Sequence, residues 1–218
     1  MRILAIADEL SPGLPDLGGP PPDVVVSCGD LPWEELERIV ELVNVPLLYV
    51  PGNHDPAVVA STPTAVGAWP IPIESAHLAD PPGPRGCTNV DGRIEDAAGL
   101  RFAGLGGSVR YRAGPNQYTQ SSMARRARAL ADRALLRRVR DGRRVDVLLT
   151  HSPPKDLGDD DDPAHEGFAA FHRLVRRLRP KLLLHGHVHP YGIARGDRML
   201  DSTRVVNVVP YKILELEP

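Results

Sequence analysis

The segment 46–55 reads PLLYVPGNHD and joins an apolar run to a cluster of polar residues. The run Pro46–Val50 is short and apolar, which predicts a buried strand. Pro51-Gly52 then ends the strand, because proline cannot donate to a sheet ladder and glycine permits a sharp turn. The cluster Asn53–Asp55 follows directly and offers an amide, an imidazole and a carboxylate. A strand that ends in chemically useful side chains is the unit from which the fold is built.

The same unit occurs twice earlier in the chain. Arg2–Ala7 leads to Asp8, and Val24–Ser27 leads to Asp30. Asp8, Asp30 and Asn53 are separated by 22 and 23 residues, the length of a strand, a crossover and a return. Repeated strand–crossover units predict an α/β protein with a largely parallel inner sheet.

Three segments predict helices. Trp33–Val43 has apolar residues at helical spacing with glutamates on the other face, which is typical of an amphipathic helix. Two further helices are expected at Gln120–Arg140 and Pro163–Leu178. Short strands are expected at Pro70–Ile73, Thr88–Val90, Gly92–Asp96, Leu100–Ala103, Val145–Thr150, Leu182–His185, Val205–Val208 and Tyr211–Leu216.

The totals describe an ordinary globular protein. A length of 218 residues is typical of one domain, so we expect a single domain over 1–218. The N-terminal run reaches Asp8 too early for a signal peptide, and no apolar run approaches the ~20 residues of a membrane span. Cys28 and Cys87 do not suggest a disulfide framework. We therefore expect a cytoplasmic protein with no membrane partner.

One arginine-rich segment bears on nucleic-acid binding. Gln120–Arg144 carries nine arginines, whereas the net charge of the chain is only −2. Such a segment is compatible with a nucleic-acid face, but a solvated helix surface explains it equally simply. We favour the solvated surface and expect no stable nucleic-acid partner. The sequence leaves the oligomeric state open.

Five polar clusters stand at the ends of predicted strands: Asp8, Gly29-Asp30, Gly52–Asp55, His151 and His185–His189. In an open α/β sheet the carboxyl ends of the strands share one rim, so residues that are distant in sequence converge there. Their carboxylate, amide and imidazole groups suit Mn, Fe or Zn better than Ca or a thiolate-binding metal. The sequence therefore predicts a divalent metal site.

The order of these clusters resembles the calcineurin-like metallophosphoesterase family, whose pattern is D-x-H, G-D, G-N-H-[DE], a single His and G-H-x-H. Four of the five blocks are intact between Asp8 and His189. The resemblance implies a four-layer α/β/β/α sandwich, with two mixed β-sheets flanked by helices. Further features resemble the small single-domain phosphodiesterase branch of the family: Gly104–Ser108, Tyr111, Thr150–Pro154, His165 and Gly167.

The resemblance also implies a centre of two divalent metal ions. Asp30 would bridge both ions, and Asp8 and His189 would hold the first. The ligands of the second ion would be Asn53, His151 and His187. Mn is the first expectation for both ions, with Fe, Zn, Mg or Co as alternatives.

Two histidines would act on the substrate. By the resemblance, His54 is not a ligand but lies beside the phosphorus, where it stabilises charge or protonates the leaving oxygen. His165 is expected to contact the substrate. The implied reaction is the hydrolysis of phosphodiesters, such as cyclic nucleotides or other small diesters, by a metal-bridged hydroxide. A small phosphoester is then the expected binding partner.

The first block departs from the family pattern, because Leu10 stands where the family has histidine. Leucine cannot bind a metal, so the first ion loses a ligand. Three outcomes are open: water completes the site, Glu9 replaces the ligand, or the site is weak or empty. We favour water, because alternation along the strand should send Glu9 to the opposite face. On this interpretation, Leu10→His should tighten binding of the first ion.

Two alternatives to a phosphodiesterase follow. The protein could be a phosphomonoesterase, or a weakly active or non-catalytic metal-dependent binding or scaffold protein. Retention of His54 favours an enzyme, since a scaffold has no need of an acid beside the metals.

Overall fold

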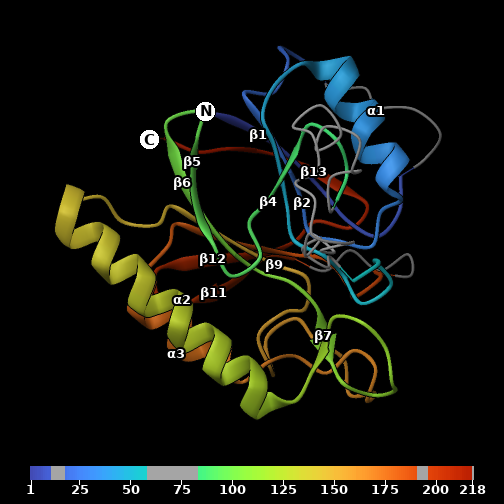
Figure 1. The fold of residues 1–218 in the computed structure, drawn as a ribbon, viewed down its shortest axis with the longest axis vertical. Coiled ribbons are helices and arrows are strands. Elements are labelled where there is room, and N and C mark those ends of the chain that lie inside the picture. Colours follow the sequence, from blue (N-terminus) through green and yellow to red (C-terminus); the bar gives the residue numbers. More distant parts are fainter. Residues whose placement is uncertain (11–17, 58–82, 191–195, 218) are drawn as a thin grey trace, which may run out of the picture.

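The computed structural model describes residues 1–10, 18–57, 83–190 and 196–217 (Figure 1). Its first sheet has the strand order β13-β1-β2-β3-β4. Strands β1 to β4 are parallel, and β13 pairs antiparallel with β1. The bounds are β1 Arg2–Ile6, β2 Val24–Ser27, β3 Leu47–Tyr49, β4 Cys87–Asn89 and β13 Tyr211–Glu215.

The second sheet has the strand order β11-β12-β10-β9-β6-β5. Its four central strands are parallel, and the two edge strands, β5 and β11, are antiparallel to their neighbours. The bounds are β5 Ile94–Ala97, β6 Leu100–Leu105, β9 Val147–Thr150, β10 Leu182–His185, β11 Arg198–Leu200 and β12 Thr203–Asn207. A separate short pair joins β7 (Ser108–Val109) and β8 (Gln117–Tyr118) in parallel.

Alternation along the strands divides the core into three apolar layers. In β1, Ile3 and Ala5 pack between the two sheets, whereas Leu4 and Ile6 pack beneath a helix, as expected when successive side chains point to opposite faces. Helix α1 (Trp33–Val43) covers the outer face of the first sheet. Helices α2 (Gln120–Asp141) and α3 (Ala170–Leu178) cover the outer face of the second.

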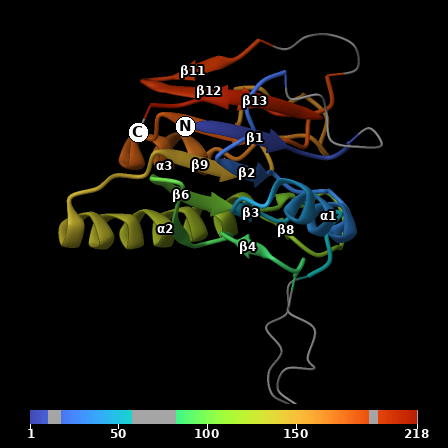
Figure 2. The same cartoon turned by 90° about the horizontal axis from the view of Figure 1, so that it is seen from above.

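The result is a four-layer α/β/β/α sandwich of two mixed sheets, which confirms the predicted fold class. Figure 2 shows α2 and α3 on one side of the strands and α1 on the other. Because both faces of each sheet are buried, the central strands are mostly apolar, as in Val24–Ser27 and Val147–Thr150, where only the last residue is polar.

One predicted helix begins in the wrong place. The range Pro163–Leu178 was expected to be helical, but α3 begins at Ala170. Upstream, Asp162 Oδ1 accepts from the backbone N–H of Ala164 and of His165, and Asp159 Oδ2 accepts from that of Gly167. These side-chain hydrogen bonds hold the backbone in turns. They take the place of the backbone hydrogen bonds that a helix would need over these residues. The strand expected at Pro70–Ile73 lies outside the described residues.

The arginines of α2 fasten the helix to the second sheet. Arg126 forms an ion pair with Asp91, and Arg133 Nη1 donates to the carbonyl of Gly92. Arg137 Nη1 donates to the carbonyl of Ile94. Several arginines of the segment are therefore engaged within the protein. Within the described ranges, none of the helices has the length and apolar character needed to cross a bilayer.

Candidate metal centre

The predicted site residues converge where the carboxyl ends of both sheets meet. Asp8 follows β1 and Asp30 follows β2, in the first sheet. His151 directly follows β9 and His187 lies two residues beyond β10, in the second sheet. The two sheets thus contribute ligand residues to one shared rim, as the rule for α/β sheets predicts.

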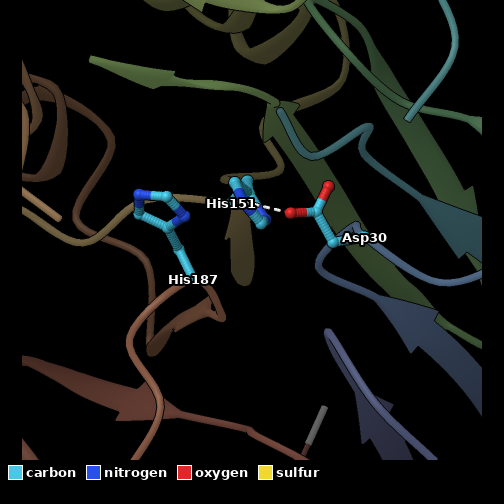
Figure 3. A group of neighbouring side chains, drawn as sticks. All are labelled: Asp30, His151 and His187. Carbon is cyan, nitrogen blue, oxygen red and sulfur yellow. Dashed lines mark ion pairs between the residues drawn. The ribbon is translucent and has the colours of Figure 1, made fainter. Parts of the chain in front are cut away.

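Asp30, His151 and His187 form a group whose candidate ligand atoms all lie within 4.8 Å of one another. Figure 3 shows the His151 ring between Asp30 and His187. His151 Nε2 lies 3.3 Å from Asp30 Oδ2, and the rings of His151 and His187 are 4.7 Å apart between centroids. Their spacing is that of side chains that could share one ion.

His151 is fixed by contacts of both ring nitrogens. Its Nδ1–H donates to the backbone carbonyl of Cys28 at 2.7 Å, which directs Nε2 toward the centre. Burial alone lowers the pKa of a histidine, but the carboxylate of Asp30 prevails and raises the pKa of His151 to about 9. The position between Asp30 and Nε2 therefore attracts positive charge, either a proton or a metal cation.

His187 is oriented in the opposite sense. Its Nε2–H donates to the backbone carbonyl of Ala164 at 2.8 Å, so Nδ1 carries the free lone pair. Burial and the neighbouring His151 lower the pKa of His187 to about 3, which keeps the ring neutral. A neutral imidazole held through its other nitrogen is the usual form of a metal-binding histidine.

Asn53 completes this part of the centre. Its Oδ1 lies 3.0 Å from His151 Nε2, and its Nδ2 donates to the hydroxyl of Tyr111 at 3.3 Å. Tyr111 therefore sets the orientation of the amide, with the oxygen turned inward. We call Asn53, His151 and His187 the inner half of the centre, with Asp30 shared. All three side chains of this half are buried.

Asp8 and His189 form what we call the outer half. Asp8 Oδ2 accepts from the backbone N–H of His187 at 2.9 Å, and Asp8 Oδ1 lies 3.8 Å from His189 Nε2. The His189 side chain is 33% exposed, in contrast to the inner histidines. Leu10 is turned away and packs partly buried against the apolar cluster beneath α1. The outer half is thus less enclosed.

Unusual backbone conformations place the ligands. Asp8, Asp30 and His187 have φ values of 64°, 60° and 68°, a left-handed region that costs ordinary residues energy. Glycine is required beside them, because a Cβ at Gly52 would collide with the carboxylate of Asp30. A Cβ at Gly186 would likewise collide with Asp8. The glycines of the motifs thus allow close approach to the carboxylates.

The remaining predicted residues border the centre. His54 is exposed, and its backbone N–H donates to Asp30 Oδ1 at 2.8 Å. Within the described residues, His54 is not part of a group that could hold a metal. His165 stacks against His187 at 5.1 Å between centroids, and its Nδ1 lies 2.8 Å from Asp162 Oδ2. Every predicted site residue therefore lies in or beside one rim.

The sequence did not predict several contacts that orient the candidate ligands. The carbonyls of Cys28 and Ala164 hold the two inner histidines, and a backbone carbonyl leaves no signal in residue type. Asp55 accepts from the backbone N–H of both Asp30 and Gly52, so it ties two ligand loops together. Its place at the end of the G-N-H-D block was a visible signal, but a simple turn explained it equally well.

The donor set fits a divalent cation. It offers a carboxylate and two imidazole nitrogens whose other ring nitrogens are both engaged, which is the chemistry of a Mn, Fe or Zn site. The family model of the calcineurin-like phosphoesterases matches residues 2–191, most of the chain. The chain belongs to the calcineurin-like phosphoesterase family. Membership supports metal-dependent hydrolysis of phosphoesters, with divalent ions as cofactors.

Solved structures share the fold of this family member. The crystal structure of TT1561 of Thermus thermophilus is 21% identical with a TM-score of 0.57, over 95% of this chain and 88% of its own. Another crystal structure is 17% identical with a TM-score of 0.57, over 95% of this chain and 90% of its own. At these identities the likeness concerns the fold alone. No curated protein matches the chain.

Proposed function

We propose that this calcineurin-like phosphoesterase hydrolyses small phosphodiesters at a dinuclear centre of divalent ions, with Mn²⁺ as the first candidate. The observation that carries the proposal is the buried group Asp30, His151 and His187 with the exposed His54 beside it. A group of side chains that binds a metal ion would, by itself, also suit a protein that only binds its partner. An exposed histidine anchored to the shared carboxylate adds a group that can exchange a proton with a substrate.

In this proposal the inner half holds one ion, Asp8 and His189 hold the other, and Asp30 bridges both. When bound, such a pair of ions neutralises the phosphate and lowers the pKa of water. The protein's own contribution is to fix the ligands beforehand. The carbonyls of Cys28 and Ala164 hold the inner rings, and Asp55 holds the Asp30 and Gly52 loops in register.

His54 is proposed as the general acid. Its backbone is bound to Asp30 Oδ1, whereas its side chain reaches solvent at the mouth of the centre. From there the imidazole can protonate the oxygen that leaves when the ester bond breaks. His165 is proposed to contact the substrate, because Asp162 holds its Nδ1 and Nε2 remains for a substrate oxygen.

The charge of the described side chains does not by itself separate a diester from a monoester. Asp8, Asp30 and Asp55 bring three carboxylates to the rim, and among the described residues no lysine or arginine forms an ion pair with any of them. A diester carries a single negative charge, whereas a monoester carries up to two. The two cations of the proposed centre would offset these carboxylates, so turnover of the two ester classes decides between them.

Turnover of two aryl esters tests the proposal. The full chain, loaded with Mn²⁺, should cleave bis(4-nitrophenyl) phosphate faster than 4-nitrophenyl phosphate. The reverse order would indicate a phosphomonoesterase. Cleavage of neither ester with Mn²⁺, Fe²⁺, Zn²⁺, Mg²⁺ or Co²⁺ would contradict an enzyme and favour a metal-dependent binding protein.

The His54→Ala variant tests the assigned acid. Turnover of the diester should fall by about 10²–10⁴-fold, the usual contribution of a general acid, while the metal content stays at the wild-type value. His172→Ala is the matched control, since this half-buried histidine of α3 donates to the carbonyl of Lys155. Loss of metal in His54→Ala would show that His54 is a ligand.

The wider setting is also proposed. We propose a single domain over 1–218 that acts in the cytoplasm on a small phosphoester, without a stable nucleic-acid partner. The two cysteines support a reducing compartment, because Cys28 and Cys87 are both free.

A further inference from the structure

We infer that Glu9 is a positioning residue of the outer half: it holds the ring of His189 so that Nε2 faces the ion bound by Asp8. The inference rests on the dinuclear centre of the proposed function. It concerns the position at which this chain departs from the family pattern, because Leu10 supplies no ligand there.

The His189 ring lies between two carboxylates. Asp8 Oδ1 is 3.8 Å from Nε2, and Glu9 Oε1 is 3.9 Å from Nδ1. Two ligand atoms that each bind an ion at about 2.1 Å lie no more than about 4.2 Å apart. The Asp8–Nε2 separation therefore fits an ion between them. The Glu9–Nδ1 separation meets the same limit, but the proposed centre has its ion at the buried Asp8, and the 66% exposed Glu9 faces the other ring nitrogen.

Glu9 reaches this position because the strand has already ended. Strand β1 stops at Ile6, and Asp8 has a φ of 64°. The N–H of Glu9 then donates to the carbonyl of Ala7 at 2.7 Å, which closes a tight turn around Asp8. Strict alternation, which would send Glu9 to the opposite face, no longer applies. The turn brings Glu9 to His189 and lets Leu10 pack beneath α1.

A carboxylate at Nδ1 has a defined effect on a metal-binding histidine. Within hydrogen-bonding distance it accepts the Nδ1–H, so the lone pair is on Nε2, and it makes that nitrogen a stronger ligand. The 66% exposed side chain of Glu9, at 3.9 Å, must approach Nδ1 by about 1 Å to form this bond. Asp8 cannot serve in this way, since it faces Nε2 and accepts from the backbone of His187. In the inner half, the carbonyls of Cys28 and Ala164 do the same for His151 and His187. Glu9 is placed to give the outer half the corresponding contact.

Metal titration of Glu9→Gln tests the inference. The full chain is titrated with Mn²⁺ in competition with a chromophoric chelator. The second, weaker equivalent should lose about tenfold in affinity, the lower end of the effect of such orienting groups, and the first equivalent should not change. Glu41→Gln is the matched control, because Glu41 is an exposed glutamate of α1. It should leave both equivalents unchanged.

Two further measurements separate positioning from general stability. The melting temperature of the metal-free protein should be the same in Glu9→Gln and wild type. In the Zn²⁺-loaded wild type, ¹⁵N NMR should place the remaining proton of His189 on Nδ1. The inference is overturned if Glu9→Gln binds the second equivalent as tightly as wild type, if the proton is on Nε2, or if wild type binds only one equivalent. The first two results leave the proposed function standing, whereas a single equivalent in wild type would contradict the dinuclear centre of the proposed function as well.

Discussion

The inner and outer halves of the proposed metal centre both contain histidine but differ in enclosure. His151 is fully buried. A backbone carbonyl accepts from its Nδ1–H and so directs its Nε2 toward the centre. His189 is 33% exposed along its side chain, and its neighbour at Nδ1 is the carboxylate of a 66% exposed glutamate. Backbone contacts are rigid and cannot be lost by mutation of a side chain. The comparison predicts a tight inner site and a weaker, more easily altered outer site.

The largest expected effect comes from the residue that both halves share. Asp30→Asn should abolish binding of both Mn²⁺ equivalents, whereas Asp8→Asn should remove only the weaker one. Because a metal ion contributes several kcal/mol of charge stabilisation, diester turnover by Asp30→Asn should fall on the order of 10³-fold. Metal analysis and turnover of the purified variants check this. Loss of one equivalent in both variants would contradict a bridging Asp30.

A smaller effect is expected from Tyr111, a side chain that orients the proposed inner ligand Asn53. Tyr111→Phe removes the hydroxyl that accepts from Asn53 Nδ2, so the amide can rotate. The inner equivalent should weaken by about tenfold, with the outer equivalent unchanged. Tyr118→Phe is the control, since that ring packs under the guanidinium of Arg126. An unchanged affinity in Tyr111→Phe would mean that the loop alone fixes Asn53.

The carboxylate of Asp30 beside His151 predicts a pH dependence of the metal-free protein. Its folded pKa is about 9 against an ordinary value of 6.5. A raised folded pKa gives stability that is fully present below pH 6.5 and is lost as the pH rises through 9. Thermal unfolding in EDTA should therefore show a falling melting temperature across this window. The pKa of His187 is lowered to about 3, so its effect on stability falls below pH 6.5 and does not overlap with this window.

Saturating Mn²⁺ should remove this decline, because the ion takes the place of the proton beside Asp30. A metal-free melting temperature that stays constant from pH 6.5 to 9 would show that His151 carries no proton in the folded protein.

The smallest effect on metal binding is expected at Leu10. The sequence alone suggested that Leu10→His would tighten the outer site. In the structure Leu10 packs against the apolar cluster beneath α1, so a histidine there would give up these contacts before it could reach an ion. We expect a loss of roughly 1 kcal/mol in stability and an outer affinity close to that of the wild type. Tightening of tenfold or more would restore the original hypothesis.

The convergence of the candidate ligand residues was predictable because of where they stand. Asp8, Asp30 and His151 each lie at or just beyond the end of an apolar strand, and parallel strand ends share a rim. This feature depends on local pattern, which a sequence shows directly. The second sheet and the four layers, which the structure confirms, were expected only from the family resemblance.

The supporting contacts were not predictable in the same way. The carbonyl of Ala164 reaches His187 only because the segment before α3 forms turns where a helix was expected. Glu9 reaches His189 only because Asp8 adopts a positive φ. Both depend on backbone conformations that residue types alone do not specify.

The number and inequality of the bound ions test the account most directly. Calorimetric titration of the metal-free full chain with Mn²⁺ should give two equivalents, with dissociation constants that differ by at least about tenfold, as expected when one ligand set is complete and enclosed and the other lacks a histidine. Titration of Asp8→Asn should retain only the tighter equivalent. A single equivalent in wild type, or two of equal affinity, would contradict a dinuclear centre with unequal halves.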